Sequence, residues 1–159
     1  MRSMKLSAAL CVAALFIAGP AFAQQMPNPY GPNINLATAK KVAAAAAAKA
    51  VEMKVNMVIA VVDTGGHLVY LERFDVMQWG SIDVAIHKAK ASAQYKRATL
   101  ALENAVKSNV NYLTLDGISA IEGGVPIIED GKIIGAVGAS GGSSAQDGQV
   151  AGAGAAIVK

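Results

Sequence analysis

Two segments of the chain carry groups that could bind a ligand, and the first contains His67. This histidine follows the turn Thr64-Gly65-Gly66 and begins an apolar segment. Imidazole is a common axial ligand of haem iron, so His67 is a candidate iron ligand in a haem site. The alternative is a histidine at the surface or in the packing. The other histidine outside the N-terminal segment, His87, shares a helix face with charged residues and is expected to lie in water.

The second candidate is the loop of Ser140, Gly141, Gly142, Ser143 and Ser144, which precedes a helix of small residues. Loop amides and the positive end of a helix dipole attract anions, so a haem propionate, another carboxylate or a phosphate would fit there. The alternative is a capping loop, in which Ser144 caps the helix and Asp147 stabilises the helix dipole. The two interpretations are compatible.

Other residues are expected to shape the turns around these two segments. The Asp63 carboxylate is predicted to bond the amides of the turn that follows it. Arg73 and Asp75 are expected to pair across the end of a strand, as a structural contact. The full set of turn and site-shaping residues is Asp63, Gly65, Gly66, Arg73, Asp75, Gly123, Gly124, Pro126 and Asp147.

Several chemistries are excluded by missing motifs. The chain has no phosphate-binding P-loop, no His-Glu-x-x-His zinc motif and no Gly-x-Ser-x-Gly nucleophile elbow. Its one cysteine, Cys11, lies in the N-terminal segment, and two histidines without suitably spaced ligands do not make a structural zinc site. A binding protein is the favoured class, and an enzyme stays open as the alternative.

The N-terminus has the pattern of a signal peptide covering residues 1–23. Arg2 and Lys5 are followed by an apolar stretch over 6–18 and by Ala21-Phe22-Ala23, a typical cleavage sequence. We expect a periplasmic or secreted protein after cleavage near Ala23. Cleavage would leave 14 − 2 = 12 basic against 11 acidic residues, a net charge of +1. That charge gives no argument for a nucleic-acid partner.

The remaining chain predicts an α+β fold. Residues 24–35 form a proline-rich arm, and residues 36–159 form one domain. Two hairpins make a mainly antiparallel sheet flanked by helices, in the order α-β-β-α-β-β-α. Asn35 is the expected cap of the first helix and Ser81 that of the second, whereas residues 100–121 contain a short helix and loops. The expected helices are 36–53, 82–97 and 144–158, and the expected strands are 57–62, 67–73, 125–129 and 132–139.

Taken in order, these blocks resemble the GlcG/HbpS-like haem-binding family. The resemblance covers residues 36–159 and implies a helix-flanked antiparallel sheet and a homo-oligomer. It also implies haem binding. Some haem-binding members of the family act together with a membrane sensor kinase. In one departure, Gly148 stands where family members commonly carry an acid. The matching motifs are Asp63 with Gly65-Gly66, Arg73-Phe74-Asp75, Lys88-Ala89-Lys90-Ala91, Gly123-Gly124-Val125-Pro126-Ile127, Gly135-Ala136-Val137-Gly138, Ser140-Gly141-Gly142 and Gln146-Asp147.

The expected function is therefore that of an exported haem- or tetrapyrrole-binding protein in a sensory or haem-handling pathway. One alternative is a periplasmic binding or accessory protein for a small organic acid, because other members are linked to organic-acid or diol metabolism. A second alternative is a haem-degrading enzyme. The expected partners are a small-molecule ligand, further copies of the chain and a membrane sensor.

Overall fold

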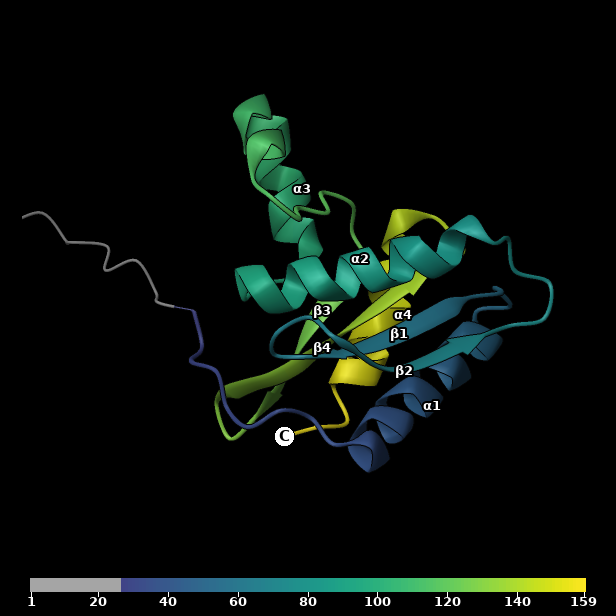
Figure 1. Ribbon diagram of the computed structural model, residues 1–159. Coiled ribbons are helices and arrows are strands. Elements are labelled where there is room, and N and C mark those ends of the chain that lie inside the picture. Colours follow the sequence, from purple (N-terminus) through teal and green to yellow (C-terminus); the bar gives the residue numbers. More distant parts are fainter. Residues whose placement is uncertain (1–26) are drawn as a thin grey trace, which may run out of the picture.

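A computed structural model describes residues 27–159, so the predicted signal peptide and the first residues of the arm lie outside the described part. Figure 1 shows helices on both sides of a four-stranded sheet. The elements are α1 (Leu36–Glu52), β1 (Val58–Asp63), β2 (Leu68–Arg73), α2 (Gly80–Tyr95), α3 (Thr99–Ser108), the 3-10 helix η1 (Val110–Thr114), β3 (Gly124–Glu129), β4 (Lys132–Ser140) and α4 (Ser144–Ala155).

The sheet has the strand order β2-β1-β4-β3, and all its pairs are antiparallel. Each hairpin supplies one edge strand and one central strand. β1 and β4 pair from Val58 opposite Ser140 to Asp63 opposite Gly135. The segment after β1 and the segment after β4 therefore leave the sheet at opposite ends.

The molecule has three layers because both faces of the central strands are apolar. α2 covers one face, where its alanines pack against Val58, Ala60 and Val62. α1 and α4 cover the other face, which includes Ile59 and Val61. The β1 residues from 58 to 62 are fully buried, as the continuous apolar run predicts.

The expected α+β class and mainly antiparallel sheet are confirmed. The short helix expected over residues 100–121 is found as α3, which begins one residue earlier and is followed by η1, and Figure 1 shows α3 projecting away from the sheet. Asn35 caps α1, since its side chain accepts a hydrogen bond from the Thr38 amide at 2.9 Å. The prediction of Ser81 as a cap is wrong. α2 already begins at Gly80, and Ser81 is buried inside it, where its hydroxyl accepts from Gln78.

The proline-rich arm lies against the start of β4. The Ile133 amide donates to the Pro29 carbonyl, and the Gly31 amide donates back to the Ile133 carbonyl, both at 2.8 Å. Ile34 is buried, and its amide donates to the Ile134 carbonyl. β1 pairs with β4 only as far as Gly135, and the arm takes over the hydrogen bonding of β4 at Ile133 and Ile134. No helix within residues 27–159 has the length and apolar character needed to cross a membrane.

Candidate functional site

The turn between β1 and β2 is organised around the Asp63 carboxylate. Asp63 Oδ1 accepts hydrogen bonds from the amides of Gly65 and His67, both at 2.9 Å. The same carboxylate lies 3.2 Å from His67 Nδ1. The predicted turn chemistry of Asp63 is confirmed. Burial alone would raise the pKa of this carboxyl, but the hydrogen bonds from His67 and Gly65 outweigh it and hold the pKa below its ordinary value.

This arrangement orients the His67 ring. A carboxylate next to Nδ1 favours the tautomer with the proton on that nitrogen, which leaves the Nε2 lone pair free to bind a metal. The His67 side chain is 83% exposed, whereas that of Asp63 is 17% exposed. The imidazole is therefore fixed on its inner side and accessible on its outer side, which is the geometry of a histidine ligand backed by a carboxylate.

The amides of the loop after β4 are bound by side chains of the same loop and helix. Asp147 Oδ1 accepts from the Gly141 amide at 3.1 Å and from the Gly142 amide at 3.0 Å. The Ser143 amide donates to Gln146 Oε1 at 2.9 Å. Three of the amides that could have received an external anion are thus satisfied internally, which corresponds to the capping alternative.

Ser143, and not Ser144, caps α4. Its backbone is extended, and its side chain forms a capping box with Gln146. Ser144 is the first helical residue. Ser140 is buried in β4, so its side chain is not part of an open loop. The predicted cap was one residue too late, although the predicted helix and the place of Asp147 in its first turn are both found.

A buried ion pair holds this loop. Lys88 Nζ lies 2.7 Å from Asp147 Oδ2 and donates to the Ala139 carbonyl at 3.3 Å. The two side chains are 2% and 4% exposed. Asp147 therefore links a buried cation to the Gly141 and Gly142 amides. Sequence reasoning noted Lys88 only as part of a motif. Its position three residues after the buried Ala85 and one before the buried Ala89 was the available signal that it faces the core.

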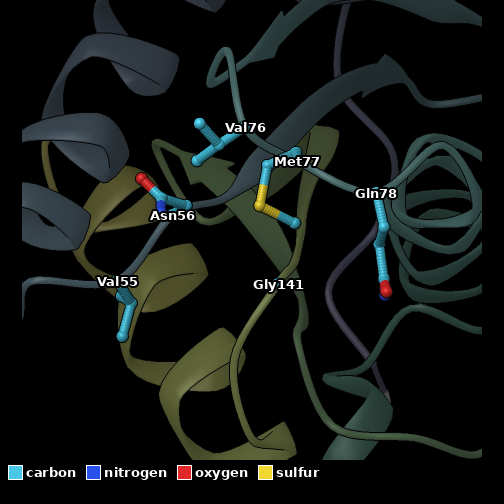
Figure 2. A pocket seen from close by; sticks show the side chains of 6 residues that line it. All are labelled: Val55, Asn56, Val76, Met77, Gln78 and Gly141. Carbon is cyan, nitrogen blue, oxygen red and sulfur yellow. The ribbon is translucent and has the colours of Figure 1, made fainter.

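The fixed loop forms one wall of a pocket of about 310 Å³, lined by Val55, Asn56, Val76, Met77, Gln78 and Gly141. Figure 2 shows Met77 pointing from the 74–79 loop toward Gly141, with Asn56 and Val55 on the other side. A Cβ at position 141 would overlap the Asn56 carbonyl oxygen and lie 2.9 Å from Met77 Cε. Glycine is needed here because two neighbouring segments approach its backbone closely.

The two candidate segments do not meet within one chain. His67 follows the end of β1 that pairs with Gly135, whereas Ser140 pairs with Val58 at the other end. The five residue-to-residue steps from Val58 to Asp63 span roughly 17 Å at about 3.4 Å per step. An iron held by His67 and a propionate held by the 140–144 loop of the same chain would therefore lie at opposite ends of the sheet.

Three other residues singled out in the sequence, Arg73, Gly123 and Gly124, lie among contacts within the fold. Arg73 is not paired with Asp75 among the ion pairs of residues 27–159. Its guanidinium carbon lies 4.4 Å from the centroid of the Trp79 ring, so stacking replaces the expected pair. The Gly124 amide donates to the buried Thr99 hydroxyl at 2.9 Å, and Gly123 precedes β3.

The structure also explains why a proline is tolerated at position 126 and why a glycine stands at position 148. Pro126 lies in β3, which is an edge strand, where the missing amide is tolerated. Gly148, which departs from the family pattern, has the Glu122 carboxylate against it, so that a side chain there would collide with Glu122. The carboxylate of Glu122, from another segment, thus occupies the space that a side chain at position 148 would take.

Comparison with known proteins gives relatives along most of the chain. It is 39% identical over 119 residues to an uncharacterised 15.0 kDa protein from the dhaT–dhaS intergenic region of Citrobacter freundii, covering 72% of this chain and 84% of that one. It is 40% identical over 83 residues to protein GlcG of Escherichia coli K12, covering 52% of this chain and 62% of GlcG.

Solved structures share the fold. The crystal structure of HbpS aligns with a TM-score of 0.76 and 27% identity, covering 93% of this chain and 99% of that one. The crystal structure of a PduOC:heme complex aligns with a TM-score of 0.72 and 25% identity, covering 80% of this chain and 96% of that one. The model of the family described as "Haem degrading protein HbpS-like" matches residues 34–156, so the chain belongs to the HbpS-like family.

Proposed function

We propose that this protein binds haem, with His67 as an axial ligand of the iron. The observation that carries the proposal is the Asp63–His67 arrangement, in which a carboxylate lies at Nδ1 and the far side of the ring is exposed. Membership of the HbpS-like family and likeness to a protein solved as a haem complex support the same ligand.

The donor set at this turn fits haem. His67 offers one accessible imidazole, which would hold the iron of haem as a single protein ligand. Bound haem would supply the redox and ligand-binding chemistry of its iron. The role of the protein would be to hold and orient the imidazole. Asp63 does so through one contact to the ring and through its bonds to the Gly65 and His67 amides.

We propose further that the protein is exported, as the signal-peptide pattern indicates, and that it works as an assembly of identical copies. The exposure of His67 supports the second point, because a haem held there by one chain would keep its other face in water. Apolar side chains on and beside the projecting α3 and η1 segments are also exposed, namely Leu100, Val110, Tyr112, Leu113 and Leu115. A second copy would remove such surface from water. A membrane sensor remains the proposed partner in a signalling role.

Haem titration tests the function. Adding haemin to the purified protein should give a saturable shift of the Soret band at micromolar haem. An unchanged Soret band in the wild type would contradict haem binding. His67→Ala should change the position of the band or weaken binding, whereas the control Lys40→Met should behave as the wild type, since Lys40 is an exposed residue of α1 outside the proposed sites. Equal spectra for wild type and His67→Ala would contradict the ligand assignment alone.

Haem degradation is a second candidate, favoured by the description of the family. It requires oxygen and an electron donor in addition to bound haem. Incubation of the haem-loaded protein with ascorbate in air should then bleach the Soret band and release iron that a ferrous chelator captures. Free haem under the same conditions is the control. Bleaching no faster than that of free haem would leave binding as the function.

A further inference from the structure

A small pocket on the outer side of α2 has the composition of an anion site. His87, Lys90, Gly117 and Ile118 line about 200 Å³ between the helix and the loop before β3. The loop is held on the helix because the Tyr95 hydroxyl donates to the Asp116 carbonyl at 2.5 Å. Gly117 takes a positive φ of 68°, which turns the chain over the pocket.

The charges of this lining select for a negative ligand group. Lys90 is a cation, His87 can donate a hydrogen bond, and the described residues that line the pocket include no carboxylate. Ile118 adds one apolar contact. The two donors are three residues apart on α2, so they lie on the same face of the helix, one turn apart. A carboxylate can accept from both at once because it has two oxygens.

The size of the pocket decides what can enter. Its volume of about 200 Å³ lies below the range of about 300–1,000 Å³ that is typical of pockets for drug-sized ligands. That space admits a carboxylate with a short carbon chain, but it is too small for a tetrapyrrole ring. A larger ligand could therefore place only an acidic side arm here.

The pocket adjoins the His67 turn through Lys90. A Cβ at Gly66 would lie 2.8 Å from Lys90 Cγ, so the stem of this lysine packs directly against the residue before His67. Lys90 thus contacts the β1–β2 turn and also lines the pocket. The loop after β4, where a carboxylate contact was expected from the sequence, lies at the other end of the sheet and binds Asp147 with its amides.

We propose that His87 and Lys90 form a carboxylate-binding site in this pocket. The carboxylate belongs either to a free small organic acid or to a propionate arm of haem, and in the second case the inference rests on the haem binding proposed above. The site then supplies the acidic-group contact at the same end of the sheet as His67.

The experiment has one arm for each source of the carboxylate. In the first, succinate is titrated while the His87 ring signals are followed by NMR, for wild type, Lys90→Met and the control Lys40→Met. Methionine keeps the apolar stem that packs on Gly66, and Lys40 is an exposed lysine of α1. In the second arm, the same proteins are titrated with haemin and with haemin dimethyl ester, in which both propionates are neutral.

For a free acid, succinate should shift the His87 signals, and Lys90→Met should weaken its binding about fivefold or more while Lys40→Met does not. For a propionate, Lys90→Met should weaken haemin binding by a similar factor and leave the binding of the ester unchanged. Either result supports the site. The proposal is overturned if Lys90→Met binds succinate and haemin as the wild type does, or if the wild type binds neither. Succinate binding without haem binding would contradict only the haem function.

Discussion

Lys88 Nζ lies 2.7 Å from Asp147 Oδ2, and both side chains are almost fully buried. Removing one partner would leave the other charge buried without compensation, so Lys88→Met should destabilise the protein by about 3–5 kcal/mol. Asp147→Asn added to Lys88→Met should recover much of this loss, because asparagine keeps an oxygen for the Gly141 and Gly142 amides without a charge. Urea denaturation of the three proteins measures these differences.

Lys107→Met is the matched control for the buried pair. Lys107 pairs with Glu103 at 2.6 Å, but its side chain is 66% exposed, and an exposed pair of this kind contributes at most about 1 kcal/mol. A loss for Lys88→Met no larger than that for Lys107→Met would show that the Lys88–Asp147 contact does not hold the loop.

The cap of α4 can be tested with two adjacent serines. Ser143→Ala removes the side chain that forms the capping box with Gln146, and it should cost about 0.5–2 kcal/mol of stability. Ser144→Ala changes the first helical residue and should stay within about 0.5 kcal/mol of the wild type. Thermal unfolding of both variants provides the comparison. A larger loss for Ser144→Ala than for Ser143→Ala would restore the cap position expected from the sequence.

Two glycines of α4 should respond in opposite directions to alanine. Apart from the backbone of α4 itself, no atom of residues 27–159 lies within 4 Å of a Cβ at Gly152, so Gly152→Ala should stabilise the helix by about 0.5–1 kcal/mol. A Cβ at Gly154 would lie 2.8 Å from the Val42 carbonyl oxygen and 3.1 Å from Ala46 Cβ. Gly154→Ala should therefore push α4 from α1 and cost about 1–3 kcal/mol. The melting temperature should rise for Gly152→Ala and fall for Gly154→Ala, relative to the wild type. Equal shifts would contradict the close α1–α4 contact.

The depressed pKa of Asp63 makes its contribution to stability depend on pH. Because the pKa of this carboxyl is lower in the folded than in the unfolded chain, its stabilisation is fully present above the unfolded value of about 3.9. It is lost as the pH falls through the folded value. Asp63→Asn should therefore destabilise the protein at neutral pH, and its difference from the wild type should shrink as the medium is acidified below about pH 4.

Urea unfolding of wild type and Asp63→Asn across this range measures the effect, and an NMR titration of the Asp63 carboxyl gives its pKa directly. Asp75→Asn serves as the control, because Asp75 is exposed and lies near the end of the same hairpin. A gap between wild type and Asp63→Asn that stays constant or widens on acidification would contradict the bonds from His67 and Gly65.

The helices and strands of this fold were predictable from the sequence where a local sequence pattern specifies them. Six successive apolar residues, 57–62, predict the buried β1, and Asn35 and Asp63 make hydrogen bonds within a few residues of themselves. The position of the α4 cap was missed by one residue. Both Ser143 and Ser144 can cap, and the choice depends on which of them takes extended backbone angles.

The candidate site was less predictable because it depends on contacts between distant residues. The Gly141 and Gly142 amides are not free for a ligand because they donate to Asp147. The buried charge of Asp147 in turn requires Lys88, which is 59 residues away in the chain. The pocket of His87 and Lys90 needs the loop around Gly117 to fold back on α2. No periodicity within either segment encodes these contacts.

The hydrogen bonds between residues 29–34 and β4 set a limit on how the chain can be shortened. A truncated protein starting at Asn35 would keep every helix and strand found within residues 27–159, yet it would expose the main-chain groups of Ile133 and Ile134 beside the end of β1. Exposed edges of this sort recruit strands from other molecules, so such a truncation is expected to aggregate. Expression tags are accordingly better joined ahead of Pro29 than close to α1.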